Sequence, residues 1–299
     1  MIRPGARVPV PPWGLAVTAM LSVQLGSALS VDLIGQVGAA GTAWLRLSMG
    51  AVIFLVIARP PLSRVRRSDV PLLLGLGVTT GLVTIGFLSA LEHIPLGTAV
   101  AIEFLGPLTV AALRTHSTRA LVWPGLALCG VVLLTEPWHG EVNLIGVMYA
   151  ALAAIGWGIY ITLTQRIGDR FTGISALSLT IPVAALTAAV IGVPQAAGHL
   201  DLGVLAAAAG LAVLLPVLPF ALEMLALRRM TATAFGTLMS LEPAMGLLLG
   251  LIVLHQQPSP LQLAGILLVV LAGAAAQRGG RRTPSPEPAH STPELGPTP

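Results

Sequence analysis

Long uninterrupted apolar runs constrain this chain more than any other feature of its sequence. Residues 13–31 (WGLAVTAMLSVQLGSALSV) and 144–164 (LIGVMYAALAAIGWGIYITLT) contain no charged residue. A helix needs about 20 such residues to cross the roughly 30 Å hydrocarbon core of a bilayer. A membrane β-barrel would show short alternating segments instead. The runs therefore predict an all-α membrane protein.

The composition agrees with a place in the lipid bilayer. Hydrophobic residues make up 55% of the chain and charged residues only 9%, whereas about a quarter of the residues in soluble domains are charged. The basic residues do not gather in one patch, so we expect no nucleic-acid partner. The single cysteine, Cys129, permits no internal disulfide.

The apolar runs divide into ten predicted membrane spans, and the arginines support that number. All 16 basic residues are arginine, and all but Arg46 precede the first span or follow an even-numbered one. Short cytoplasmic loops collect arginine, so we expect both termini to be cytoplasmic and the protein to lie in the inner membrane. The predicted spans are 13–32, 38–58, 70–91, 95–113, 120–135, 144–165, 174–193, 202–226, 231–254 and 259–276.

The two ends of the chain differ from the spans. Arg3 and Arg7 before the first apolar run also suit a signal peptide, but the length of the run favours a retained span after a cytoplasmic N-terminus, residues 1–12. Residues 277–299 are rich in proline, serine and charge. This composition predicts a disordered cytoplasmic tail, with a regulatory or interaction segment as the alternative.

The chain contains an internal repeat. A shift of 136 residues places 93–108 (HIPLGTAVAIEFLGPL) over 229–244 (RMTATAFGTLMSLEPA), so that Pro107 meets Pro243. Each copy holds five spans, and an odd number makes the second copy enter the membrane from the opposite side. Such inverted repeats are typical of secondary transporters, which bind substrate near the bilayer midplane. The two predicted five-helix repeats are residues 13–135 and 144–276.

Two ionisable residues lie at similar depth within the predicted spans. A charge at the bilayer centre costs roughly 2.5 to 3.5 kcal/mol on insertion scales, so such residues usually face a cavity or each other. Arg46 and Glu103 each lie eight residues into spans that start from the same side. If they pair, Glu103 stays ionised and serves a structural pair or a substrate clamp. Alone in an apolar cavity, it can take up a proton near neutral pH and serve proton coupling.

A second glutamate, Glu242, lies near mid-depth in the other repeat copy. Each of the two glutamates adjoins a proline, Glu103 with Pro107 and Glu242 with Pro243. Proline releases a backbone carbonyl from the helix, and this is tolerated at membrane depth where neighbours or water satisfy it. A kinked helix with an open carbonyl beside a carboxylate suits an ammonium group. A kink used only for packing is the alternative.

Further polar and aromatic residues are candidates for the cavity wall. They lie on the first and sixth spans, which the repeat makes equivalent, and packing or interfacial roles are the alternative. Glu223 lies five residues before Arg228, so we expect it at the cytoplasmic interface rather than in a binding site. The four wall candidates are Gln24, Trp157, Tyr160 and Gln165.

The sequence contains no motif for catalysis or metal binding. The six histidines fall in loops, at span ends or in the tail, and no two have ligand spacing. Nucleotide-binding and hydrolase motifs are absent as well. We therefore expect no enzyme activity, no cofactor and no metal.

The segments around the two glutamates carry a resemblance to a known family. Residues 86–113 (GFLSALEHIPLGTAVAIEFLGPLTVAAL) and 218–254 (LPFALEMLALRRMTATAFGTLMSLEPAMGLLLGLIVL) resemble the EamA family of the drug/metabolite transporter superfamily, nearest to its threonine/homoserine exporter branch. The resemblance covers about residues 14–276. It implies ten helices in two inverted repeats, a central cavity, and proton-coupled export of amino acids. Many relatives have Gly-Glu where this chain has LHQQ (254–257), so Gln256 preserves only hydrogen bonding there.

We therefore predict a secondary transporter that exports a small zwitterionic amino acid, threonine or homoserine by the resemblance. Glu103 takes the ammonium group or the coupled proton, Arg46 the carboxylate or a balancing charge, and Glu242 a second polar contact. One alternative is transport of another metabolite or drug, such as a hydrophobic cation that does not need Arg46. The other is a membrane scaffold or sensor that transports nothing. The oligomeric state is left open.

Overall fold

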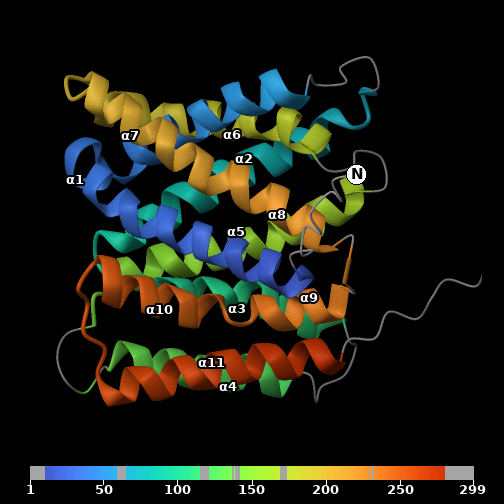
Figure 1. Ribbon diagram of the computed structural model, residues 1–299, viewed down its shortest axis with the longest axis vertical. Helices are drawn as coiled ribbons and strands as arrows, with labels where there is room; N and C mark the ends of the chain where they lie inside the picture. Colours follow the sequence, from blue (N-terminus) through green and yellow to red (C-terminus); the bar gives the residue numbers. More distant parts are fainter. Residues whose placement is uncertain are drawn as a thin grey trace, which may run out of the picture.

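The computed structural model is a bundle of α-helices, without a strand in the part of the chain that is described (Figure 1). The prediction of an all-α membrane protein is confirmed in this respect. The described residues are 11–58, 65–114, 121–136, 138, 142–168, 174–227, 229–230 and 232–279. Most of the predicted N-terminus (1–12) and tail (277–299), and part of the arginine-bearing loops, lie outside them.

The predicted spans coincide with helical residues. Seven helical stretches of the described chain are long and apolar enough to cross a membrane, and two shorter apolar helices accompany them. The chain is thus a multi-pass membrane protein. The elements are α1 (Pro12–Ala58), α2 (Val70–Leu91), α3 (Leu96–Arg114), α4 (Val122–Thr135), α5 (Leu144–Gly168), α6 (Ile174–Ala196), α7 (Leu202–Ala212), the π-helical η3 (Val213–Val217), α8 (Leu218–Leu227), α9 (Ala232–Met239), α10 (Glu242–Val253) and α11 (Pro260–Gly279).

Helix α1 is a hairpin rather than one straight rod (Figure 1). Arg46 Nη1 donates to Ser30 Oγ at 3.3 Å across 16 residues, which a straight helix would separate by about 24 Å. The chain turns at Gly38, whose φ of 73° and ψ of 168° suit glycine. The side chain of Gln195 lies only 2.2 Å from where a Cβ on Gly38 would be. Its Oε1 also accepts from the N–H of Gly41 at 2.9 Å, so α6 fixes the turn in α1.

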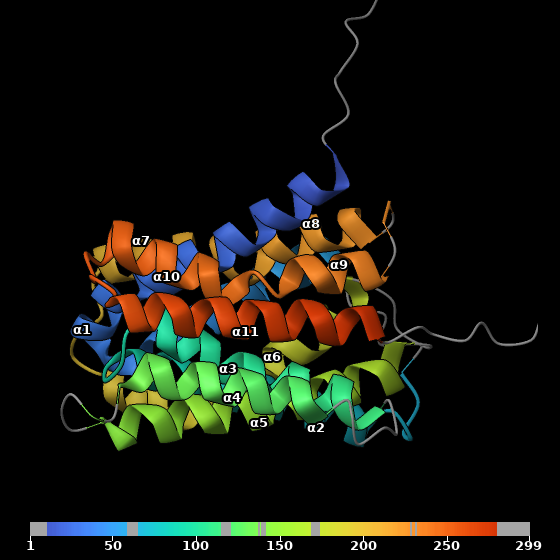
Figure 2. The ribbon, with the colours of Figure 1, turned by 90° about the horizontal axis from the view of Figure 1, so that it is seen from below.

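Close backbone contacts hold neighbouring helices together. A Cβ added to Gly130 of α4 would lie 2.6 Å from the carbonyl oxygen of Gly265 in α11, and the reverse contact has the same length. A Cβ added to Gly106 of α3 would lie 2.0 Å from the carbonyl oxygen of Ala154 in α5. Small residues let membrane helices approach this closely. Figure 1 and Figure 2 both show α4 against α11 at one edge of the bundle.

The chain reversals gather at two ends of the bundle. The start of α1 and the finish of α11 lie at the same end in both views (Figure 1, Figure 2). The opposite end holds the Gly38 turn and the connections 92–95, 197–201 and 254–259, none of which contains arginine. We call this the arginine-free end. The other is the arginine-rich end, where the described residues include Arg66, Arg67, Arg166 and Arg229.

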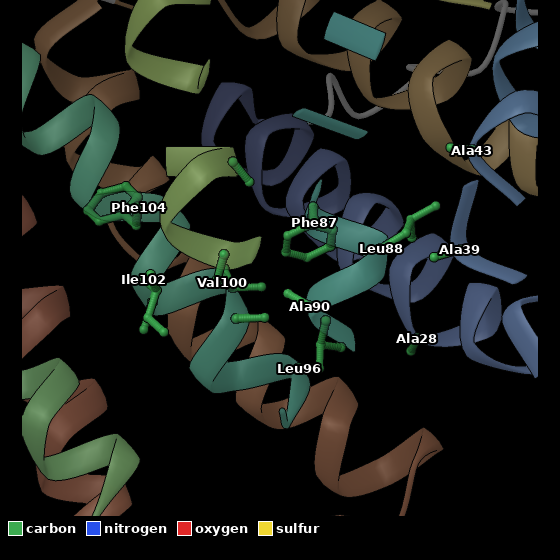
Figure 3. Close-up of a cluster of buried hydrophobic side chains, with 14 of the residues drawn as sticks. Ala28, Ala39, Ala43, Phe87, Leu88, Ala90, Leu96, Val100, Ile102 and Phe104 are labelled. Atoms are coloured by element: carbon green, nitrogen blue, oxygen red, sulfur yellow. The ribbon is translucent and has the colours of Figure 1, made fainter. Parts of the chain in front are cut away.

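The largest buried core draws residues from α1 to α6, α10 and α11, and Figure 3 shows the part to which α1, α2 and α3 contribute. Alanine is its commonest residue, and larger side chains fill the spaces between the helices. Lipid solvates exposed apolar groups as well as a core does, so close packing rather than escape from water holds these helices together. Figure 3 labels Ala28, Ala39, Ala43, Phe87, Leu88, Ala90, Leu96, Val100, Ile102 and Phe104.

Candidate functional site

A cavity of about 320 Å³ lies inside the bundle. Residues from both halves of the chain line it, although they are far apart in sequence. All six residues predicted for substrate or proton binding are among them, and their roles stay predictions. The six are Gln24 and Arg46 from α1, Glu103 from α3, Trp157 and Tyr160 from α5, and Glu242 from α10. The side chain of Gln165 lies outside the described residues.

Arg46 is held in place by a short chain of hydrogen bonds. Its side chain is 4% exposed, and Nη1 donates to Ser30 Oγ at 3.3 Å. The Ser30 hydroxyl donates to the carbonyl oxygen of Gly26 at 2.6 Å. This contact occupies one of the N–H groups of the guanidinium, which carries several. The hairpin in α1 thus orients Arg46 while leaving donors to face the cavity.

Arg46 and Glu103 lie near enough to interact by charge. They form no direct ion pair in the described part of the structure. The sequence left open whether the two side chains pair or stand alone. The structure shows an intermediate arrangement, because both side chains line the cavity and their charges interact without a direct ion pair among the described residues.

Three carboxyl groups face the cavity, one more than expected. Glu223 from α8 joins Glu103 and Glu242, and Glu242 interacts by charge with both. The expectation for Glu223 is therefore wrong in part, because Glu223 lines the cavity, although it does so from near the arginine-rich end of α8. The physical reason is η3, where Leu215 has non-helical φ and ψ of −159° and 111°. This break changes the helical phase, so the face of α8 does not follow from that of α7.

Neither of the two predicted kink prolines lines the cavity. Proline has no N–H, so in a helix interior it leaves the carbonyl four residues earlier without its helical partner. For Pro107 this is the carbonyl of Glu103, which lines the cavity. Pro243 stands in the first turn of α10, where amides have no helical partner in any case. Helix α3 continues through Pro107. The helix is interrupted between α9 and α10, just before Pro243.

The side-chain oxygen of Gln24 is a buried acceptor that lacks a donor among the described residues. Gln24 is 3% exposed and lines the cavity. Leaving a buried polar atom unsatisfied costs about 1 to 3 kcal/mol, so such atoms in native proteins call for an explanation. A donor group on a bound molecule would satisfy this oxygen.

Apolar and hydroxyl residues that sequence reasoning did not select complete the cavity wall. Phe87 from α2 and Phe220 from α8 add to the aromatic surface of Trp157 and Tyr160. Two threonines, Thr80 and Thr84, lie one turn apart on α2, and the Thr84 hydroxyl donates to the Thr80 carbonyl oxygen at 2.8 Å. Their spacing along one face of α2 is the only sequence signal that would have indicated them.

The arrangement combines one buried cation, three carboxyl groups and an aromatic wall. These groups suit a small molecule with both a positive and a negative group. Within the described residues, no cluster of three histidine, cysteine, aspartate or glutamate side chains is arranged to hold a metal.

Comparisons with known proteins agree with this description. Residues 144–275 match the sequence profile of the EamA-like transporter family. The threonine/homoserine exporter RhtA of Escherichia coli strain K12 is 34% identical over 275 residues, which cover 90% of this chain and 93% of that protein. Its counterpart in Salmonella typhimurium strain LT2 is 33% identical over 291 residues, covering 94% and 97%. One solved crystal structure superposes with a TM-score of 0.59 at 19% identity, covering 88% of this chain and 96% of that chain, which concerns the fold alone.

Proposed function

The chain belongs to the EamA-like transporter family, and from this premise we propose that it exports a small amino acid of the threonine or homoserine class across the inner membrane. One observation carries the proposal: a single cavity among membrane helices collects Arg46 and three glutamates inside an aromatic wall. The relatives that are threonine/homoserine exporters support the substrate class. The family is one of transporters, not of enzymes.

The groups of the cavity match the groups of an amino acid. Arg46, oriented by Ser30, receives the substrate carboxylate through charge-assisted hydrogen bonds. Glu103 and the unsatisfied oxygen of Gln24 accept from the ammonium group. Glu242 supplies a second polar contact from the other half of the chain.

Export is coupled to protons in this proposal. The cavity contains three carboxyl groups, whereas one ammonium group needs only some of them. Glu103 can then hold either the ammonium group or a proton, but not both. Competition of this kind makes proton entry drive substrate release. Loss of the response to an imposed pH gradient in Glu103→Gln would be the expected result.

Ten helices in two inverted repeats complete the proposed architecture, with both termini in the cytoplasm. Helices that the repeat makes equivalent pack against each other in three pairs: α1 with α6, α3 with α10, and α4 with α11. Gly130 and Gly265, whose contact is reciprocal, lie within one residue of equivalent positions in the repeat, which supports a two-fold relation between the copies. The placing of the arginines at one end supports the cytoplasmic assignment.

A second solute class has one observation in its favour. Three carboxyl groups face a single arginine among aromatic side chains, and such a wall also suits a hydrophobic cation. The two classes differ in their need for Arg46. Arg46→Ala should abolish amino-acid transport, whereas transport of a cation would survive it.

The test is a counterflow assay with purified protein. Liposomes loaded with unlabelled threonine are placed in labelled threonine, and wild type is compared with Glu103→Gln. Glu92→Gln is the matched control, because Glu92 is exposed at the end of α2. We expect wild type and control to exchange threonine in competition with homoserine, and Glu103→Gln to lose exchange. Folded wild type without exchange would contradict the substrate class, and full exchange by Glu103→Gln would contradict its role.

A further inference from the structure

Side-chain hydrogen bonds join the two halves of the chain at the arginine-free end, in addition to the bond that Ser22 Oγ donates to the Leu214 carbonyl oxygen further from that end. Gln195, at the end of α6, accepts from the N–H of Gly41 at 2.9 Å. Gln256, after α10, accepts from the N–H of Leu96 at 3.2 Å. Two further bonds tie α4 to α11: Ser259 Oγ to Glu136 Oε1, and Gln262 Nε2 to the Leu134 carbonyl oxygen.

The two glutamines act on corresponding places. Leu96 begins α3, and Gly41 lies in the first turn after the break at Gly38. The first amides of a helix have no acceptor within it, so a glutamine oxygen from outside satisfies them. Gln195 thereby caps the helix that carries Arg46, and Gln256 caps the helix that carries Glu103. Each capping residue comes from the other half of the chain.

Gln256 fits tightly into its position. Its Oε1 lies 2.7 Å from where a Cβ on Gly250 would be, so only glycine leaves room for it. Its own N–H donates to the Gly250 carbonyl oxygen at 3.0 Å. The neighbouring Gln257 is exposed. The hydrogen bonding that the sequence attributed to Gln256 is therefore directed at the start of α3.

The cavity reaches toward both ends of the bundle. On the arginine-free side its lining includes Phe87, four residues before the end of α2 at Leu91, and Val100, four residues after the start of α3 at Leu96. On the arginine-rich side it includes Leu177, near the start of α6, and Glu223, near the end of α8. Gln256 caps the start of α3 at Leu96, so this cap lies just beyond Val100 at the arginine-free side of the cavity.

We propose that Gln195 and Gln256 form a latch that closes the cavity toward the arginine-free end. The latch rests on the proposed transport function. It adds to that function the two side chains whose hydrogen bonds are made in the conformation closed toward the arginine-free end and broken in the open one. Both bonds join the two halves, so rocking of one half against the other breaks them. Substrate then leaves through the arginine-free end.

Access of a thiol reagent to the cavity tests the latch without measuring transport. Cys129→Ala removes the native thiol, and Ser27→Cys places an isosteric one in the cavity wall. A membrane-impermeant maleimide is added outside intact spheroplasts. Gln256→Ala should speed labelling about fivefold, the population shift expected from losing one hydrogen bond. Gln257→Ala is the matched control and should label like the parent.

A conservative variant separates capping from folding. Gln256→Glu keeps an acceptor oxygen, so it should label at the parent rate. The latch is refuted if folded Gln256→Ala labels no faster than the parent, or if Gln257→Ala speeds labelling equally. Faster labelling only in inverted vesicles would support the latch and overturn the proposed orientation. Failure of threonine exchange would leave this result unchanged, because the reagent reports on access alone.

Discussion

Helix α3 and the pair α9–α10 are equivalent in the repeat, yet they present their glutamates differently. Helix α3 is continuous, with Glu103 in its interior four residues before Pro107. In the other copy the helix is interrupted between α9 and α10. Glu242 stands directly before Pro243 in the first turn of α10. Glu103 precedes its proline by four residues and lies in a helix interior, whereas Glu242 precedes its proline by one residue and lies at a helix start.

The electrostatic consequences differ accordingly. The first turn of a helix stabilises negative charge through its free amides and its dipole, and Glu242 has this support. Glu103 lacks it and instead faces the charge of Arg46. We infer that Glu103 depends on Arg46 for compensation, whereas Glu242 has the support of its helix start against the like charges of Glu103 and Glu223.

The largest expected effect concerns what anchors α3. A Cβ on Gly106 would lie 2.0 Å from the Ala154 carbonyl oxygen, so Gly106→Ala must push α3 away from α5. Overpacking of this kind costs up to about 3 kcal/mol. Gly210→Ala in α7 is the control, because nothing lies within 4 Å of its Cβ position, and it should leave stability equal or higher. Thermal unfolding in detergent measures both. Equal stability of the two variants would show that α3 is no more tightly packed at Gly106 than α7 is at Gly210.

The next effect concerns the two carboxyl groups themselves. Losing a charge-assisted hydrogen bond costs about 1.5 to 3 kcal/mol, so Glu103→Gln should slow threonine counterflow about 100-fold. Glu242→Gln should slow it only about tenfold, since that residue makes the second contact. Initial exchange rates at saturating threonine decide the order. Equal losses would mean that the two copies contribute alike, and the reverse order would make Glu242 the principal site.

The charged part of this site was predictable because burying charge is costly. Arg46, Glu103 and Glu242 stand out in apolar runs, and the structure brings all three to one cavity. Gln24 and Tyr160 were found through the repeat, which related the helices that carry them. The helix bounds followed from the change in polarity along the chain. The ten-span inverted topology remains a proposal.

The residues that were missed depend on tertiary structure. Glu223 was misplaced because η3 interrupts the helix before it, which periodicity does not reveal. Gln195 was not selected, and the sequence attributed hydrogen bonding to Gln256 without its partner. Both lie next to helix ends, where polar residues normally meet water, and their partners belong to the other half of the chain. Phe87 resembles every other apolar residue in a span. Local sequence carries none of this information.

A smaller effect should follow from the prolines. Pro107→Ala restores an N–H in the interior of α3, which would give the Glu103 carbonyl its helical partner and straighten the helix beside the cavity. We expect about fivefold slower exchange together with higher thermal stability. Pro243→Ala lies in the first turn of α10, where amides have no helical partner in any case. It should change exchange by less than about twofold. Similar losses in both variants would contradict the distinction between helix interior and helix start.

The smallest effect concerns Gln24, in the first half of α1, whose side chain lies against α10. Its Oε1 is 3.4 Å from where a Cβ on Gly246 would be, so a change at Gln24 tests the side of the cavity formed by α10, the helix of Glu242. Gln24→Met removes an acceptor that has no donor among the described residues, and the free energy of unfolding should stay equal or rise. The KM for threonine should rise about threefold with little change in maximal rate, because a substrate donor loses its acceptor. Gln36→Met, on the exposed surface of α1, is the control. A glutamine kept for structure would show the opposite pattern, with lower stability and an unchanged KM, so the two measurements together assign the residue to the substrate or to the fold.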